Sequence, residues 1–158
     1  MKASAPFAFL YAVLSFPSLS SACSCLQPTV QSALNEDNVD AVFRGRVIRQ
    51  IQSTDKGKNQ YLVRVWRAFK GCSFNSSATI LVETGNDPAF CGGVDLEVNQ
   101  RYVLSGRTRA TSTTIKVVGL RTQVNHTVSF AHCDYISKYD LVSEEEKNLL
   151  FEHFNQCE

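Results

Sequence analysis

Two cysteines separated by one residue stand where a secretory signal would be cut. Residues 20–28 read SSACSCLQP, and the small residues up to Ala22 fit a cleavage site. Cleavage there makes Cys23 the first residue of the mature chain. A free α-amino group has a pKa of about 7.7–8.0, so an appreciable fraction is neutral at physiological pH and carries a lone pair. Together with the carbonyl oxygen of Cys23, this amine could fill the open position of a catalytic zinc. The chemistry that the motif predicts is metal chelation by a chain terminus.

The spacing of these cysteines predicts a rigid terminus. Cys23 and Cys25 are two residues apart, so in an extended chain their side chains point the same way, and each is expected to bridge a distant cysteine. Two such bridges would clamp the first three residues and reduce the entropy that binding must remove. The alternative is a terminal strand that is stapled only for stability.

The preceding segment has the features of a leader. Residues 1–22 begin with Lys2 and contain the apolar run FAFLYAVL at 7–14, which is too short to span a bilayer. We therefore expect a secreted, extracellular protein whose mature chain is residues 23–158, a length that suits one domain with its own core. No later stretch predicts a membrane span.

Charge and cysteine content narrow the class of protein. The sequence has 16 Lys and Arg residues and 15 Asp and Glu residues, and removal of Lys2 with the leader leaves the two signs equal. This balance argues against nucleic acid as a partner. An even number of cysteines in a secreted domain predicts three disulfides, but leaves their pairing open: Cys23, Cys25, Cys72, Cys91, Cys133 and Cys157. Asn75 and Asn125 begin sequons for N-glycosylation.

The hydrophobic pattern predicts a mainly β protein with flanking helices. One or two helical turns are expected within 27–38. Ser143 and Glu146 form a capping box at the start of an amphipathic helix over 143–155. Five strands are predicted, with a possible bulge at Gly45: 41–52, 60–71, 78–84, 101–107 and 113–119. Five strands with terminal helices favour a small closed or nearly closed barrel, of which the OB-fold is one case.

Other chemistries find less support in the sequence. The histidines His126, His132 and His153 form no zinc-binding pair, and adjacent residues such as His132 and Cys133 would point to opposite faces of a strand. The carboxylates show no pattern typical of a hydrolase. Metal binding by the C-x-C motif is less favoured than oxidation after a signal peptide. A bacterial-type lipid anchor would require Leu where Ser20 stands.

Several stretches, in order, resemble one known family: CSC at 23–25, VFRGRVI at 42–48, VWRAFKG at 65–71, FCGG at 90–93, YVLSGR at 102–107 and the segment 132–158. In this order they are similar to the N-terminal, netrin-like domain of the tissue inhibitors of metalloproteinases. The resemblance implies an OB-like, five-stranded closed barrel with helices, stapled by disulfides. It also implies that the protein is an inhibitor of zinc metalloproteinases rather than an enzyme.

The same resemblance implies roles for individual residues. Cys23 would chelate the zinc held by a target protease of the matrix metalloproteinase kind, and Ser24 would enter its specificity pocket. The residues that flank and support these two complete what we call the inhibitory ridge: Cys25, Leu26, Gln27, Ala89, Phe90 and Cys91. The implied bridges are Cys23–Cys91 and Cys25–Cys133. No cofactor of its own is implied, and we expect a monomer.

The sequence departs from the family pattern at a few places. The third cysteine of the family domain has no counterpart; Cys72 is present instead, and we pair it with Cys157. The proline-rich run after C-x-C is reduced to Pro28, and Tyr139 stands where the family often has Trp. Only one domain of the family is expected here. The alternative function is a secreted netrin-like binding module without inhibitory activity.

Overall fold

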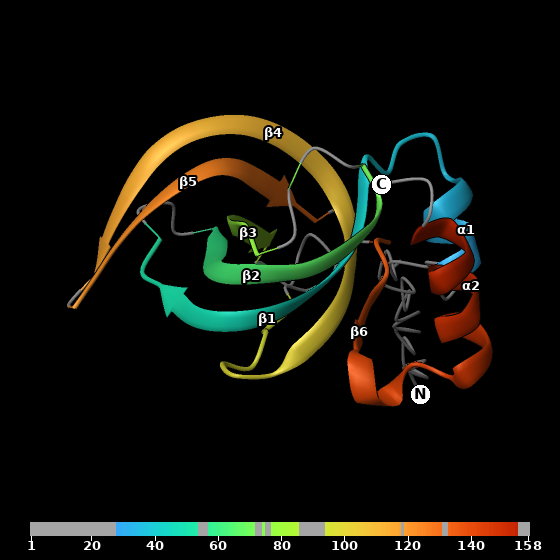
Figure 1. Ribbon diagram of the computed structural model, residues 1–158. Coiled ribbons are helices and arrows are strands. Elements are labelled where there is room, and N and C mark those ends of the chain that lie inside the picture. Colours follow the sequence, from blue (N-terminus) through green and yellow to red (C-terminus); the bar gives the residue numbers. More distant parts are fainter. Residues whose placement is uncertain are drawn as a thin grey trace, which may run out of the picture.

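The strands of this protein close into a ring. The structure is a computed structural model that describes residues 28–53, 57–71, 74, 77–85, 94–117, 119–130 and 133–154. Its strands are β1 (Ala41–Ile51), β2 (Lys58–Lys70), β3 (Thr79–Gly85), β4 (Arg101–Val117), β5 (Leu120–Ser129) and β6 (Ile136–Lys138). They are hydrogen-bonded in the order β1-β2-β3-β5-β4-β6, and a further pairing of β1 with β4 closes the first five into a ring (Figure 1). All neighbours are antiparallel except β3 and β5, which are parallel.

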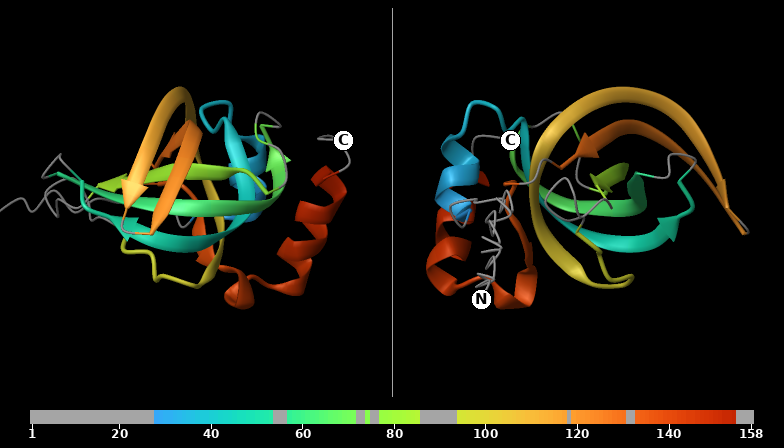
Figure 2. Two further views of the ribbon diagram at one scale, coloured as in Figure 1. Left: turned by 60° about the vertical axis from the view of Figure 1, so that its left-hand side comes forward. Right: turned by 180° about the vertical axis from the view of Figure 1, so that it is seen from behind.

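The longest strand, β4, joins the two halves of the ring. Its first part, 101–106, pairs with β1, and its second part, 107–117, pairs with β5. The β4–β5 hairpin curves over the other strands and projects from the side of the ring opposite the helices (Figure 2). The predicted strands over 41–52, 60–71 and 78–84 are confirmed as β1, β2 and β3, and the register of β1 shifts next to Gly45, as expected for a bulge there.

The prediction of two separate strands within 101–119 is wrong, because the structure has one long strand there. Residues 101–107 and 113–119 are not two strands, because β4 runs without a break from Arg101 to Val117 through the segment RATST at 109–113. A register shift between Ala110 and Thr113 absorbs the irregularity there. The chain reverses instead beside Gly119, whose φ of 78° suits glycine. The partner strand β5 over 120–129 and the short β6 were not predicted.

The helices lie together on one side of the ring (Figures 1 and 2). They are α1 (Val30–Asn35), the 3-10 turn η2 (Tyr139–Leu141) and α2 (Glu144–Phe154). The predicted capping box of α2 is confirmed, because Ser143 Oγ accepts from the Glu146 amide at 3.2 Å and the Ser143 amide donates to the Glu146 carboxylate at 3.2 Å.

Two hydrophobic cores lie on opposite faces of β1. Phe43 contributes to the core inside the ring, whereas its neighbour Val42 packs against the helices, and both are fully buried. The inner core comprises Ala41, Phe43, Val47, Tyr61, Val63, Val65, Ala68, Phe74, Ile80, Val82, Leu96, Tyr102, Leu104 and Val128. The outer core comprises Val30, Ala33, Leu34, Val39, Val42, Phe69, Val103, Tyr135, Val142 and Leu150. Because β1 is covered on both sides, the helices pack directly against the ring.

Gly106 allows the end of β5 to lie closely along β4. A Cβ at this position would lie 2.8 Å from both Phe130 Cδ1 and the Ser129 carbonyl oxygen. Contacts this short involve backbone atoms, so a neighbouring strand would have to move.

We expect the substitution Gly106→Ala to lower the free energy of unfolding by about 1–3 kcal/mol, because it overpacks a closed site. Gly85→Ala is the matched control, since a Cβ at Gly85 would meet no atom within 4 Å. Chemical denaturation of the two variants measures the difference. Equal stability of the two would contradict this account of Gly106.

Candidate functional site

The predicted inhibitory ridge lies outside the described residues. This applies to all of its members: Cys23, Ser24, Cys25, Leu26, Gln27, Ala89, Phe90 and Cys91. Cys72, Cys157 and Asn75 also lie outside the described part of the chain, so the Cys72–Cys157 bridge, like the other two, remains a prediction. The structure does describe residues that flank these segments in the sequence, and their geometry defines the candidate site.

Cys133 is disulfide-bonded. Its partner is one of the other five cysteines, all of which lie outside the described residues. Cys133 and Pro28 line the same small depression, between α1 and the segment 133–135. Pro28 follows the predicted partner Cys25 by three residues, so the predicted bridge Cys25–Cys133 would join chain segments that already lie close together.

A pair of backbone-anchoring hydrogen bonds holds the segment around Cys133. The Tyr135 amide donates to Ser105 Oγ at 2.7 Å, and the Ser105 amide donates to the Tyr135 carbonyl at 2.9 Å. Ser105 is fully buried, so both bonds are shielded from water. The Tyr135 ring packs in the outer core, and its hydroxyl lies 3.4 Å from Glu146 Oε1. Burial, followed by the nearby Glu146 carboxylate, raises the pKa of the Tyr135 phenol.

A capped helix holds the chain immediately after the inhibitory ridge. Thr29 is the N-cap of α1: its hydroxyl accepts from the Ser32 amide at 3.1 Å, and Ser32 Oγ accepts from the Thr29 amide at 2.9 Å. Val30, the first residue of α1, is fully buried in the outer core. The direction of the chain next to Gln27 is therefore set by two local hydrogen bonds and one buried side chain.

The residues on either side of the segment that contains Ala89, Phe90 and Cys91 are held together, and we call this closure the neck. Thr84 Oγ1, on β3, donates to the carbonyl of Val94 at 3.0 Å, so the two ends of 85–94 are held together. Thr84 is 2 % exposed. The end of β3 is also tied to the end of β5, because the Phe130 amide donates to the Glu83 carbonyl at 3.0 Å.

A buried carboxylate lies beside this neck. Glu83 accepts a hydrogen bond from Gln60 Nε2 at 2.9 Å and lies 3.7 Å from Lys58 Nζ and 4.0 Å from Arg109. Two cations and an amide thus compensate a carboxylate that is 8 % exposed. Next to it is a half-open hollow of about 240 Å³, lined by Gly57, Lys58, Glu83, Thr84, Gly85, Ser129 and Phe130.

Two adjacent residues of β4, Ser105 and Gly106, lie beside the chain segments that flank the predicted inhibitory ridge. Ser105 holds Tyr135, and Gly106 contacts Ser129 and Phe130. Phe130 in turn is bonded to β3, next to the neck that leads to Cys91. Ser105 and Gly106 belong to the motif YVLSGR at 102–107, but the sequence alone predicts no supporting role for them. The available signal was a pair of small residues inside a strand, which is typical of a close backbone approach.

One predicted glycosylation site lies within a strand. Asn125 is exposed on β5, as a glycan would require. Thr127 of the same sequon is buried, and its hydroxyl donates to Thr111 Oγ1 at 3.1 Å. Glycosylation of Asn125 remains a prediction.

The described part of the chain offers neither a metal-binding cluster nor a membrane-spanning helix. Among those residues, no group of three or more His, Cys, Asp or Glu side chains is placed to hold a metal ion. None of the helices described is long and apolar enough to cross a membrane.

Comparison with protein families identifies the class. The chain matches the family model for tissue inhibitor of metalloproteinase over residues 21–158. Because the match covers essentially the whole chain, the protein belongs to the tissue inhibitor of metalloproteinase family, whose members inhibit metalloproteinases and are not enzymes. A comparison with curated proteins gave no significant match.

We expect the substitution Ser105→Ala to lower the free energy of unfolding by about 1–3 kcal/mol, because it leaves the buried Tyr135 amide without an acceptor. Relative to the unsubstituted protein, the rate of amide hydrogen exchange should increase most at Tyr135. Ser112→Ala, at an exposed position of the same strand, is the control and should have little effect. Unchanged exchange at Tyr135 in the Ser105 variant would mean that this bond does not hold the segment.

Proposed function

We propose that this protein is a secreted inhibitor of zinc metalloproteinases that binds the catalytic zinc of its target through a mature N-terminal Cys23. The observation that carries the proposal is membership of the inhibitor family over residues 21–158, a range that includes the Cys23-Ser24-Cys25 motif near its start. The proposal includes removal of residues 1–22 as a signal peptide.

The chemistry requires two atoms of one residue. The α-amine and the carbonyl oxygen of Cys23 form a five-membered chelate ring with the metal, and so displace the water that occupies the open position of a catalytic zinc. Ser24 enters the specificity pocket, while Cys25, Leu26 and Gln27 contact the cleft beside it. The zinc belongs to the protease, and the inhibitor supplies only ligand atoms.

Rigidity of the inhibitory ridge is the second requirement. If the segment is already ordered before binding, the complex does not lose the free energy that ordering it at the interface would cost. The bridges Cys23–Cys91 and Cys25–Cys133 would attach the ridge to two supports: the neck closed by Thr84 and the segment held by Ser105. Ala89 and Phe90 would then pack beside the N-terminus. In this proposal the ring of five strands is the OB-like closed barrel of the family, and its role is to hold these supports in place.

The decisive experiment extends the mature N-terminus by one alanine. The extension moves the amine away from Cys23, so inhibition of a matrix metalloproteinase should weaken by on the order of 100-fold or more. An alanine added after Glu158 is the matched control and should leave inhibition unchanged. Intact mass before and after reduction confirms that both proteins carry the same disulfides.

The outcomes separate the two candidate functions. Equal inhibition by the two extended proteins would rule out chelation by the Cys23 amine. A correctly processed protein that inhibits no metalloproteinase would support the alternative, a netrin-like binding module. A secreted chain that begins elsewhere than Cys23, or whose Cys23 amine is blocked, would also remove the proposed mechanism.

A further inference from the structure

Arginines face one another across three strands on the outer side of the ring. Arg44 is opposite Arg67, and Arg46 is opposite both Arg64 on β2 and Arg101 on β4. Like charges directly opposite each other in a sheet are destabilising. The repulsion would be relieved by an anionic partner that bridges the strands.

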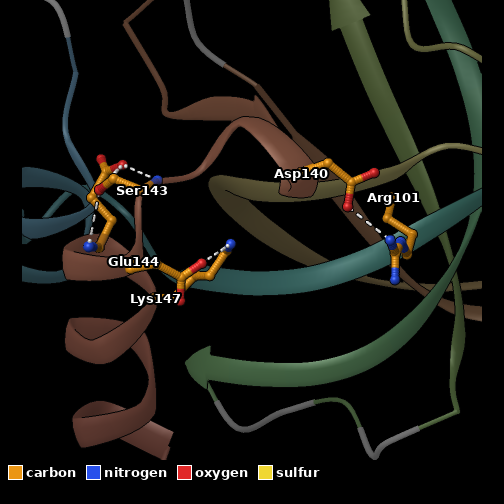
Figure 3. A network of polar contacts seen from close by, with 6 residues as sticks. Arg101, Asp140, Ser143, Glu144 and Lys147 are labelled. Atoms are coloured by element: carbon orange, nitrogen blue, oxygen red, sulfur yellow. Dashed lines mark hydrogen bonds and ion pairs between the residues drawn. The ribbon is translucent and has the colours of Figure 1, made fainter.

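The acidic residues nearby compensate only part of this charge. Asp140 pairs with Arg101 at 2.7 Å, and Glu144 pairs with Lys147 at 2.6 Å (Figure 3). Within the described part of the chain, Arg44, Arg64 and Arg67 form no ion pair with a carboxylate. Arg46 donates to a neutral acceptor, the carbonyl of Asn99, at 3.2 Å. The face therefore keeps a net positive charge that the acidic residues in the described part of the chain do not neutralise.

Aromatic rings hold two of these arginines in place. The Arg44 guanidinium lies 4.7 Å from the ring centroid of Tyr139 and 5.4 Å from that of Trp66. The Arg67 guanidinium lies 4.0 Å from the centroid of Phe154 and 5.4 Å from that of Phe151. Contact with a ring face orders a guanidinium and leaves its edge free for a carboxylate. In Arg44 this edge is the two terminal nitrogens, because its Nε is buried and has no hydrogen-bond partner within the described part of the chain.

Apolar side chains are exposed among these charges. Trp66 is 39 % exposed, Phe151 is 45 % exposed, and Leu141, two residues after Tyr139, is 76 % exposed. Buried Trp, Tyr and Arg side chains carry most of the energy at protein interfaces. Exposed aromatic residues interleaved with unpaired arginines have the composition of such a binding surface.

The geometry points to a docking surface for an acidic protein segment in which Asp or Glu alternates with apolar residues. We call this surface the arginine–aromatic face: Arg44, Arg46, Arg64, Arg67, Arg101, Trp66, Tyr139 and Phe151. Charge complementarity requires the acidic residues. The exposed rings favour a peptide over an anionic polysaccharide, because apolar side chains of a peptide can cover Trp66 and Phe151 whereas sulfate groups cannot. The face includes no residue of the inhibitory ridge, so this inference does not depend on the proposed function.

Trp66 provides a direct readout, because it is the only tryptophan in the chain. The probe is a short synthetic peptide in which glutamate and leucine alternate. Its binding should shift the emission of Trp66 to shorter wavelength and protect it from quenching by acrylamide. A peptide with the same number of glutamates and no leucine should bind at least about tenfold more weakly, since it cannot cover the exposed rings. No protease enters the assay, so failure of the proposed inhibition would not affect its outcome.

Two matched variants separate binding from folding. Arg64→Gln should weaken the alternating peptide about tenfold, because a hydrogen bond to a charged partner is lost. It should leave stability unchanged or higher, since it also relieves the repulsion from Arg46. Lys116→Gln is the control: Lys116 is exposed and faces Arg121 across the β4–β5 hairpin, so this variant removes a charge from a similar pair outside the face. It should leave peptide binding unchanged.

The inference is overturned by any of three results. The first is no change in Trp66 emission with the alternating peptide. The second is equal binding of the leucine-free peptide, which would show attraction by charge alone. The third is a response to heparin without a response to the peptide, which would assign the face to a polysaccharide.

Discussion

The pairing of β1 with β4 is the constraint on which the rest of the structure depends. It closes the ring and places Phe43 opposite Leu104 and Gly45 opposite Tyr102, so that the inner core is sealed. On the other side of the same two strands, Val42 and Val103 face the helices and build the outer core. A break in this pairing would open both cores, because each depends on residues that alternate along β1 and β4.

The same strand pairing supports two surfaces with different chemistry. Ser105 and Gly106, at the end of the part of β4 that pairs with β1, hold the chain segments on which a rigid N-terminus would depend. Residues earlier in β4 and in β1 bring Arg101 beside Arg46 on the outer side of the ring. Under the proposed function, one small domain would hold an inhibitory N-terminus and a separate charged surface, because the two faces of a strand and its two ends present different side chains.

The sequence predicted elements well where hydrophobic spacing was regular. The first three strands, the turn of helix at Val30 and the capped helix after Ser143 are confirmed. The division of 101–119 was wrong because RATST carries no apolar pattern, and a bulged strand tolerates such a segment if its partner supplies the hydrogen bonds. The residues of the candidate site were predicted from short motifs. The supporting roles of Thr84 and Ser105 could not be predicted in this way, because they depend on contacts between segments that are far apart in the sequence.

By itself, the sequence determined the family, the mainly β class and the motif Cys23-Ser24-Cys25, because these depend on residue types and short spacings. Only the tertiary structure decided that five strands close into a ring, that the neck at Thr84 and the segment at Ser105 adjoin β4 and β5, and that five arginines share one face. The physical reason is that strand order and register bring together residues far apart in the chain. A balanced net charge gives no information about where in space those charges gather.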